Sequence, residues 1–159
     1  AQEIESIAVS STKIRTAIQA GDFIKVERYL GRPFQLTGKV TKGEGIGRTL
    51  AFPTANLTID SLYKIIPPQG VYLVSLEINR VSHFGMMNIG TRPTLNGNHQ
   101  SIEVHVFDFN HDLYGKIITV SLLEKIRDEQ KFDSLEALKT QLIKDEEICK
   151  RTLNVKGLI

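Results

Sequence analysis

A glycine-rich loop with one basic residue is the first candidate for chemistry in this sequence. Gly43, Gly45 and Gly47 stand at alternate positions, and Arg48 follows directly. Glycine tolerates the positive φ angles that turn backbone N–H groups toward an anion, and the planar guanidinium of arginine matches phosphate oxygens. On glycine content alone, a hairpin turn carrying a basic residue is the simpler interpretation.

Oxygen-bearing side chains a few residues further on shift this interpretation toward a binding site. Pro53 stiffens the chain immediately before Thr54 and Asn56. Because these two residues are spaced two apart on an extended segment, both side chains face the same side, where their oxygens suit one Mg²⁺. A phosphate cradle followed by magnesium ligands indicates a nucleotide site.

The two common phosphate-binding motifs do not describe this segment. In the Walker loop the glycines are spaced more widely and a lysine stands where this chain has Arg48. The dinucleotide fingerprint requires a helix directly after the glycines, whereas Pro53 and its β-prone neighbours argue against a helix there.

Glu103 is the carboxylate best placed to act as a base. In the alternating segment 102–107, Glu103 and His105 share one face and Val104 and Val106 share the other. If the valine face packs against helices, Glu103 points into a barrel mouth or a cleft. A carboxylate there can take a proton from an alcohol that attacks a phosphate. A solvent-facing strand glutamate is the alternative.

The elements that must position these residues follow from the hydrophobic period. Two short helices are expected first, with Ser10 or Ser11 capping one and Asp22 the other, which stops at Gly31. The period then becomes two, and Asn79-Arg80 suggests a tight hairpin. The predicted strands are Phe34–Lys42, Val71–Ile78, His83–Ile89, Ser101–Phe109 and Lys116–Leu123.

The strands are expected to form an antiparallel sheet followed by one helix. No helix-length periodic segment separates the strands, so the fold class is mainly β, most simply a small antiparallel barrel. A capping box is predicted at Asp133 and Glu136. The apolar face of this last helix is predicted to comprise Leu135, Leu138, Leu142 and Cys149.

Composition limits the classes of function. The 159 residues are 41% hydrophobic and 24% charged, as expected for one soluble domain. The net charge of +2 is not the footprint of a nucleic-acid binder, and no apolar run is long enough to span a membrane. The single cysteine, Cys149, cannot form an internal disulfide, which favours a cytoplasmic location.

The motifs, in their order, resemble those of riboflavin kinases. The segment from Gly38 to Asn56, with its Phe-Pro-Thr-Ala-Asn end, resembles the signature of that family, and the resemblance covers roughly residues 31–153. One departure is Ala51, where the family usually has glycine. The other matching segments are Gly70-Val71-Tyr72, Asn88 to Thr94, the strand carrying Glu103, Leu113 to Lys116, and Ile126 to Phe132 with Ser134-Leu135-Glu136.

The resemblance implies a barrel of the riboflavin kinase type and the transfer of the terminal phosphate of ATP to riboflavin, giving FMN and ADP. It implies Glu103 as the base for the terminal ribityl hydroxyl and Thr54 and Asn56 as Mg²⁺ ligands. It also implies that the ATP site comprises Gly43, Gly45, Gly47, Arg48, Thr49, Tyr114 and Gly115, and that Arg127 and Glu129 hold the flavin.

The beginning of the chain resembles the join between the two domains of bacterial bifunctional riboflavin kinase/FAD synthetases. The matching residues run from Val9 to Arg15, followed by Gly21-Asp22 and the segment from Leu30 to Pro33. Residues 1–30 are therefore expected to be a helical remnant of an adenylyltransferase domain, and 31–159 the kinase domain. Because the core of that first domain is absent and Ala1 is not methionine, we expect a kinase module from a longer protein that does not make FAD.

Two other functions are compatible with parts of the sequence. A catalytically inactive flavin- or nucleotide-binding barrel is one, although the presence of Thr54, Asn56 and Glu103 counts against it. A barrel that binds oligonucleotides is the other; the nearly neutral charge and low aromatic content argue against that class. The oligomeric state is not indicated.

Overall fold

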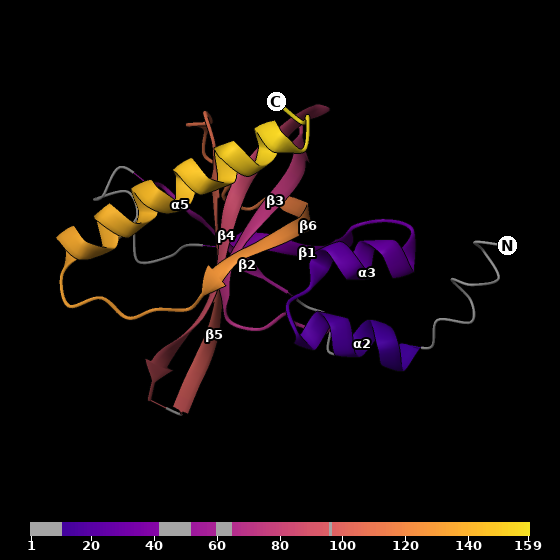
Figure 1. The fold of residues 1–159 in the computed structure, drawn as a ribbon. Helices are drawn as coiled ribbons and strands as arrows, with labels where there is room; N and C mark the ends of the chain where they lie inside the picture. The colour runs from indigo at the N-terminus through magenta and orange to yellow at the C-terminus, as the bar shows by residue number, and fades with distance from the viewer. Residues whose placement is uncertain (1–10, 42–51, 60–64, 96) are drawn as a thin grey trace, which may run out of the picture.

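A closed antiparallel barrel forms the body of the chain (Figure 1). The computed structural model describes residues 11–41, 52–59, 65–95 and 97–159. Around the barrel the described strands follow the order β1 (Phe34–Thr41), β2 (Ala55–Thr58), β5 (Gly97–Val106), β4 (Val81–Thr94), β3 (Gly70–Ile78) and β6 (Ile117–Asp128). Since β6 pairs again with β1, the ring closes, which confirms the predicted antiparallel barrel.

Alternating side chains fill the interior of the barrel. On β1, Leu36 and Val40 are buried while the residues between them are exposed, as expected for a strand with one apolar face. On β3, Tyr72 and Val74 belong to the interior core, whereas Val71 belongs to a second core outside the barrel. Both faces of β3 are therefore covered.

Two short helices, α2 (Ser11–Gln19) and α3 (Phe23–Leu30), pack onto the barrel and share its interior core. The ring of Phe23 lies 5.7 Å from that of Phe34 and 5.4 Å from that of Tyr72. Asp22 caps α3 by accepting a hydrogen bond from the Lys25 N–H, and Gly31 ends the helix in the left-handed region. These observations confirm the predicted helices and their boundaries at Asp22 and Gly31.

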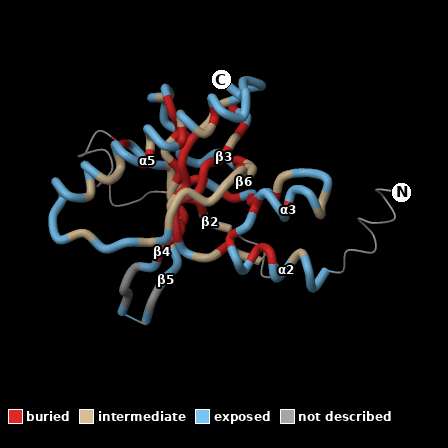
Figure 2. Tube along the Cα trace, in the orientation of Figure 1, coloured by how far each residue is buried: buried red, intermediate tan, exposed pale blue. Residues whose placement is uncertain are grey.

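The long helix α5 (Leu135–Val155) crosses the outside of the barrel (Figure 1). Figure 2 shows that many of the buried residues lie in the strands next to this helix. Cys149 and Leu153 of α5 pack there in one buried cluster, which we call the outer core and which also comprises Phe52, Val71, Leu73, Met86 and Phe107. The strands of the barrel are therefore packed on both faces, by the interior core on the inside and by the outer core on the side of α5.

The start of α5 differs from the prediction. The N-cap is Ser134, whose hydroxyl accepts a hydrogen bond from the Ala137 N–H, and not Asp133. The helix therefore begins one residue later than predicted. Leu135 is 53% exposed and does not belong to the apolar face, whereas Leu138 and Leu142 pack against the outer core.

The strands also differ in extent from the predicted ones. β4 and β6 are longer than the predicted strands at these positions. β2 was not predicted, because its four residues are too few to show an alternation of polar and apolar side chains. β5 ends at Val106 because the chain turns at Asp108, whose φ is 55°. Asn79 and Arg80 both have positive φ, which confirms the tight hairpin between β3 and β4.

Candidate active site

One line of paired residues runs across five neighbouring strand pairs on the outside of the barrel. Directly paired residues on neighbouring strands project to the same face of a sheet. Val71 in this line packs in the outer core under α5, so the whole line faces outward. We call it the outer row, and in order it comprises Thr41, Asn56, Glu103, Asn88, Val71 and Arg127.

Glu103 lies on this outer face and not in the mouth of the barrel. Its strand neighbours Val104 and Val106 pack inside the barrel, in the interior core. The sequence-based placement depended on outer helices packing against the valine face, and the structure instead places these valines inside the barrel. The outer helix α5 covers the opposite face, where Phe107 packs in the outer core with Cys149.

The outer row brings together residues that are far apart in the sequence. Asn56 and Glu103 are direct partners across β2 and β5, and Glu103 is also the partner of Asn88 on β4. Neighbouring strands are about 4.8 Å apart, so the three side chains start within about 10 Å of one another. Thr41 and Asn88 had no predicted role. In the sequence Asn88 is the first residue of a matching motif, and in the structure its neighbours Met87 and Ile89 are both buried.

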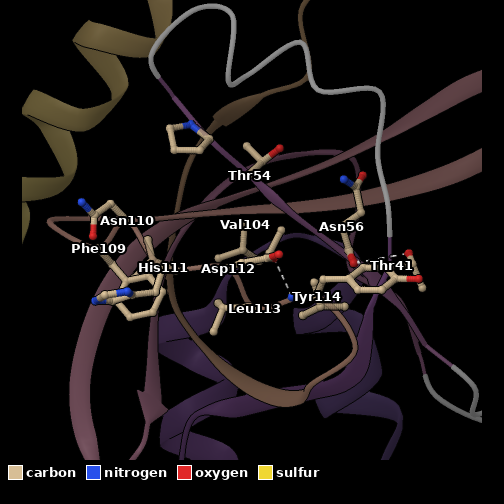
Figure 3. A pocket seen from close by; sticks show the side chains of 14 residues that line it. Thr41, Thr54, Asn56, Val104, Phe109, Asn110, His111, Asp112, Leu113 and Tyr114 are labelled. Atoms are coloured by element: carbon tan, nitrogen blue, oxygen red, sulfur yellow. Dashed lines mark hydrogen bonds between the residues drawn. The ribbon is translucent and has the colours of Figure 1, made fainter.

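A cavity of about 670 Å³ opens beside the row (Figure 3). Thr41 and Asn56 belong to both the outer row and the cavity lining, and Asn56 is the direct partner of Glu103. Thr54 and Tyr114 also line the cavity. The remaining lining residues are Val40, Pro53, Ala55, Val104, Val106, Phe109, Asn110, His111, Asp112 and Leu113.

Contacts with β5 hold the segment that carries Thr54. The His105 Nδ1 and the Pro53 carbonyl oxygen are 2.8 Å apart, a hydrogen bond when Nδ1 carries the proton. The rings of Phe52 and His105 pack edge to face at 5.2 Å. Since Ala55 then pairs with Val104, the short strand β2 is fixed directly beside the strand of the candidate base.

The opposite wall of the cavity is fixed by hydrogen bonds that two backbone N–H groups donate. The Tyr114 N–H donates to Asp112 Oδ1 at 2.8 Å, as Figure 3 shows. The Gly115 N–H donates to the Val40 carbonyl at 2.9 Å, and Gly115 has a φ of 82°, which favours glycine. Tyr114 is thereby held exposed at the edge of the cavity, where its ring can contact a bound molecule.

Arg127, at the far end of the outer row, forms an ion pair with a buried carboxylate. Its Nε and Nη2 donate to Asp145 of α5 at 2.9 and 2.8 Å, and Asp145 is completely buried. Its Nη1 donates to the Asp128 carbonyl at 3.1 Å, and its guanidinium lies over the ring of Phe132 at 5.7 Å. Arg127 thus ties β6, the following connection and α5 together. A further N–H on each of Nη1 and Nη2 is not used by these hydrogen bonds.

Glu129 lies over the outer face next to Gly90, where any side chain on residue 90 would collide with its carboxylate. Burial raises the pKa of Glu129 above its ordinary value, and the nearby Glu103 carboxylate adds to the rise. A hydrogen bond from the Gln130 N–H and the charge of Arg127 act in the opposite direction on this pKa. Two carboxylates, Glu103 and Glu129, therefore face the same region of the outer face.

The raised pKa of Glu129 makes stability depend on pH. Its pKa is higher in the folded than in the unfolded chain, so the protonated form is the one that folding favours. The stabilisation that comes from this raised pKa is present at pH values below the pKa of Glu129 in the unfolded chain. It is lost as the pH rises through the pKa of Glu129 in the folded chain. We expect Glu129→Gln to have a higher Tm than the parent at pH 7 and the same Tm in acid, measured by thermal unfolding across pH. A difference that persisted unchanged in acid would contradict this electrostatic origin.

Several candidate residues are not tested by the geometry. The structure does not describe the residues of the glycine-rich segment, namely Gly43, Gly45, Gly47, Arg48 and Thr49, nor does it describe Ala51.

Among the described residues, no three His, Cys, Asp or Glu side chains cluster in a way that would hold a metal ion by themselves. Cys149 is fully buried and burial raises its pKa to about 12, so it is a structural thiol. None of the described helices is long and apolar enough to cross a membrane.

Comparison with known proteins decides the family. Residues 30–153 match the family described as riboflavin kinase, or flavokinase. This chain belongs to the riboflavin kinase family. It is therefore a member of a family of phosphotransferases, as the order of its motifs predicted.

Relatives of this riboflavin kinase domain are longer proteins described as bifunctional riboflavin kinase/FMN adenylyltransferases. The chain is 46% identical to that of Pseudomonas fluorescens over 144 residues, covering 90% of the chain and 46% of the relative. It is 40% identical to that of Haemophilus influenzae over 152 residues, covering 95% and 49%. The chain spans about half the length of the curated relatives it matches.

Two solved structures resemble the fold of this riboflavin kinase domain. One is a Streptococcus pneumoniae protein described as a macrolide-efflux protein, with a TM-score of 0.83 and 41% identity over 89% of this chain and 46% of that one. The other is riboflavin kinase from Trypanosoma brucei, with a TM-score of 0.55 and 26% identity over 79% of this chain and 83% of that one. The efflux description concerns the pneumococcal protein only.

Proposed function

We propose that this chain phosphorylates riboflavin to FMN with ATP in a Mg²⁺-dependent reaction. The observation that carries the proposal is the direct pairing of Asn56, which lines the cavity, with Glu103 on the neighbouring strand. A metal-binding side chain and a potential base stand next to each other, as required where a phosphate donor meets an alcohol. Phosphoryl transfer depends mainly on such positioning and on charge neutralisation.

The cavity is the proposed nucleotide site. Its volume of about 670 Å³ lies within the range of sites that bind small molecules and cofactors. The apolar walls, including Val40 and Val104, suit a purine ring, and Tyr114 stands at the rim with Gly115 beside it. In this proposal the ATP phosphates extend toward the glycine-rich segment, to Gly43, Gly45, Gly47, Arg48 and Thr49.

Thr54 and Asn56 fit Mg²⁺ by the chemistry of their donors. Both offer neutral hard oxygens, and both line the cavity. Mg²⁺ in nucleotide sites usually takes few protein ligands and completes its shell with phosphate oxygens and water. When bound, it would neutralise part of the charge on the phosphates.

Glu103 is the proposed general base. Its carboxylate takes the proton from the terminal hydroxyl of the ribityl chain as that oxygen attacks the terminal phosphorus of ATP. The bond between that phosphorus and the bridging oxygen of ADP breaks, and the products are FMN and ADP. Because Glu103 projects from the outer face, the flavin must approach from the side of α5 and not through the barrel interior.

The flavin is proposed to extend from Glu103 over Asn88 toward Glu129 and Arg127, beside the part of the outer row that α5 covers at Val71. Glu129 lies over the same face, next to Gly90, and presents a carboxylate to a polar ring edge. Arg127 organises the end of the row through Asp145 and keeps N–H groups that can contact the ring.

Replacing Gly90 tests this part of the site without a large effect on the fold. In Gly90→Ala the new methyl group displaces the flexible end of Glu129, so riboflavin binding is expected to weaken about threefold to tenfold, the worth of one hydrogen bond. Flavin fluorescence quenching measures the affinity, and thermal unfolding is expected to change little. The matched variant is Gly85→Ala, whose methyl group meets the backbone carbonyl of His105 and is expected to cost stability instead, by about 1–3 kcal/mol. Unchanged riboflavin affinity in Gly90→Ala would remove Glu129 from the flavin site.

In the longer protein we propose that an adenylyltransferase domain precedes this one, with residues 1–30 derived from it and 31–159 forming the kinase domain. The relatives described as bifunctional, of which the chain spans about half, support this. In this chain α2 and α3 pack into the barrel core, so residues 11–30 are needed here for packing. The chain is expected to make FMN and no FAD.

The test is a chromatographic assay of the purified chain with riboflavin, ATP and Mg²⁺, in which FMN and FAD are measured separately. FMN that disappears when EDTA replaces Mg²⁺, with no FAD, is the expected result. Riboflavin binding without FMN would contradict the proposal and favour an inactive flavin-binding barrel.

A further inference from the structure

Asn88 carries a buried polar atom that the fold itself does not use. Its side chain belongs to the outer row, between Glu103 on β5 and Val71 on β3. Its Oδ1 is buried, and within the part of the chain that the structure describes this atom has no hydrogen-bond partner. Buried side-chain oxygens in folded proteins nearly always have a partner, so this one requires an explanation.

An unpartnered buried acceptor lowers the stability of the free protein. A polar residue that served only the fold would be paired, and an apolar residue would suit a strand flanked by Met87 and Ile89 better. The arrangement is instead typical of a group kept for a ligand that supplies the missing partner when it binds.

The position of Asn88 indicates which part of a ligand it meets. It stands one strand spacing, about 4.8 Å, from Glu103 on the side away from Asn56 and the cavity. A substrate whose terminal hydroxyl lies at Glu103 and whose ring lies toward Arg127 places its polyol chain over Asn88. A hydroxyl both donates and accepts, so it pairs with the amide in either orientation.

We propose that Asn88 is a specificity-determining residue that hydrogen-bonds a hydroxyl of the flavin side chain other than the one that is phosphorylated. This inference rests on the proposed riboflavin kinase function and adds to it the selection of a polyol chain. It does not make Asn88 part of the proton transfer, which belongs to Glu103.

The test compares two flavins in the parent chain and in Asn88→Leu, which keeps the shape of the side chain and removes its polarity. One flavin is riboflavin; the other carries a 5-hydroxypentyl chain on the same ring nitrogen and so keeps the reacting hydroxyl but lacks the others. We expect Asn88→Leu to lower kcat/KM for riboflavin about threefold to tenfold and to leave that for the hydroxypentyl flavin within about twofold. The Tm is expected to be equal or higher, because an unpartnered acceptor is removed.

Loss of activity toward both flavins by the same factor would overturn the proposal, since Asn88 would then act on the ring or on the fold. A clear fall in Tm would also overturn it. The control is Ser82→Ala, at an exposed position with the same orientation on β4, which should leave the preference between the flavins unchanged.

The same comparison by flavin fluorescence quenching separates this inference from the proposed function. If the parent chain binds riboflavin without making FMN, the kinase proposal fails. A preference in affinity for riboflavin over the hydroxypentyl flavin that Asn88→Leu abolishes would still support Asn88 as the polyol contact. An unchanged preference would overturn it.

Discussion

Replacing Glu103 with glutamine is expected to lower kcat for FMN formation by about 10²- to 10⁴-fold while riboflavin binding stays within about twofold of the parent. Glutamine has nearly the same size and retains a carbonyl oxygen, so it preserves the packing of this outer-row position. It cannot accept the proton of the attacking hydroxyl. The chemical step is therefore impaired while binding is preserved.

Single-turnover formation of FMN, together with flavin fluorescence quenching, measures the two quantities separately. Glu77→Gln is a suitable control because Glu77 is an exposed strand glutamate on β3, away from the outer row. Its turnover should match that of the parent chain. Turnover of Glu103→Gln within about tenfold of the parent would mean that another group takes the proton.

The largest effect on stability is expected from Arg127→Ala. Asp145 is 0% exposed, and removing Arg127 leaves its carboxylate buried without the cation that compensates it. Breaking a buried ion pair in this way costs about 3–5 kcal/mol in the free energy of unfolding. For a chain of this size the Tm should fall by roughly 6–20 °C.

A double variant distinguishes the free-energy cost of burying an unpaired Asp145 carboxylate from the free energy that the Arg127–Asp145 ion pair itself contributes. Arg127→Met combined with Asp145→Leu fills similar space without charge and should recover most of the lost stability. Chemical denaturation measures the free energies. Lys156→Met, which breaks the more exposed pair with Glu124, is the control and should cost less than about 1 kcal/mol. A double variant as unstable as Arg127→Ala alone would show that the pair is needed for specific geometry.

Residue types suggest the chemistry of the candidate site, but they do not predict which strands bring these residues together. Thr54 and Asn56 stand in a short extended segment that was predicted to face one way, and both line the cavity. Their adjacency to Glu103 depends on β2, a four-residue strand that pairs with β5 far along the chain. Such pairing reflects barrel closure, which no local period encodes.

The orientation of the Glu103 side chain shows what the alternation of polar and apolar residues along a strand does not predict. Alternation correctly separated Glu103 from Val104, but it does not say which face is inside. In this barrel both faces are covered, one by the interior core and the other partly by α5. The valines are therefore compatible with either placement, and the placement that depended on an outer helix over the valines is wrong.

Arg127 and Asn88 illustrate partners that sequence alone does not reveal. The carboxylate that holds Arg127 lies on a helix 18 positions later, among several other acidic residues. In the sequence Asn88 stands out only as part of a matching motif. Its buried oxygen acquires meaning once its neighbours in the outer row are known.

The most direct measurement is a crystal structure of the chain with riboflavin, ADP and Mg²⁺. We predict that the purine lies in the cavity beside Tyr114 and that the flavin lies along the outer row from Glu103. The terminal ribityl oxygen should lie within hydrogen-bond distance of a Glu103 oxygen, about 2.6–3.2 Å. A flavin bound in the cavity would contradict the proposed site. A terminal ribityl hydroxyl far from Glu103 when both ligands are bound would contradict it as well.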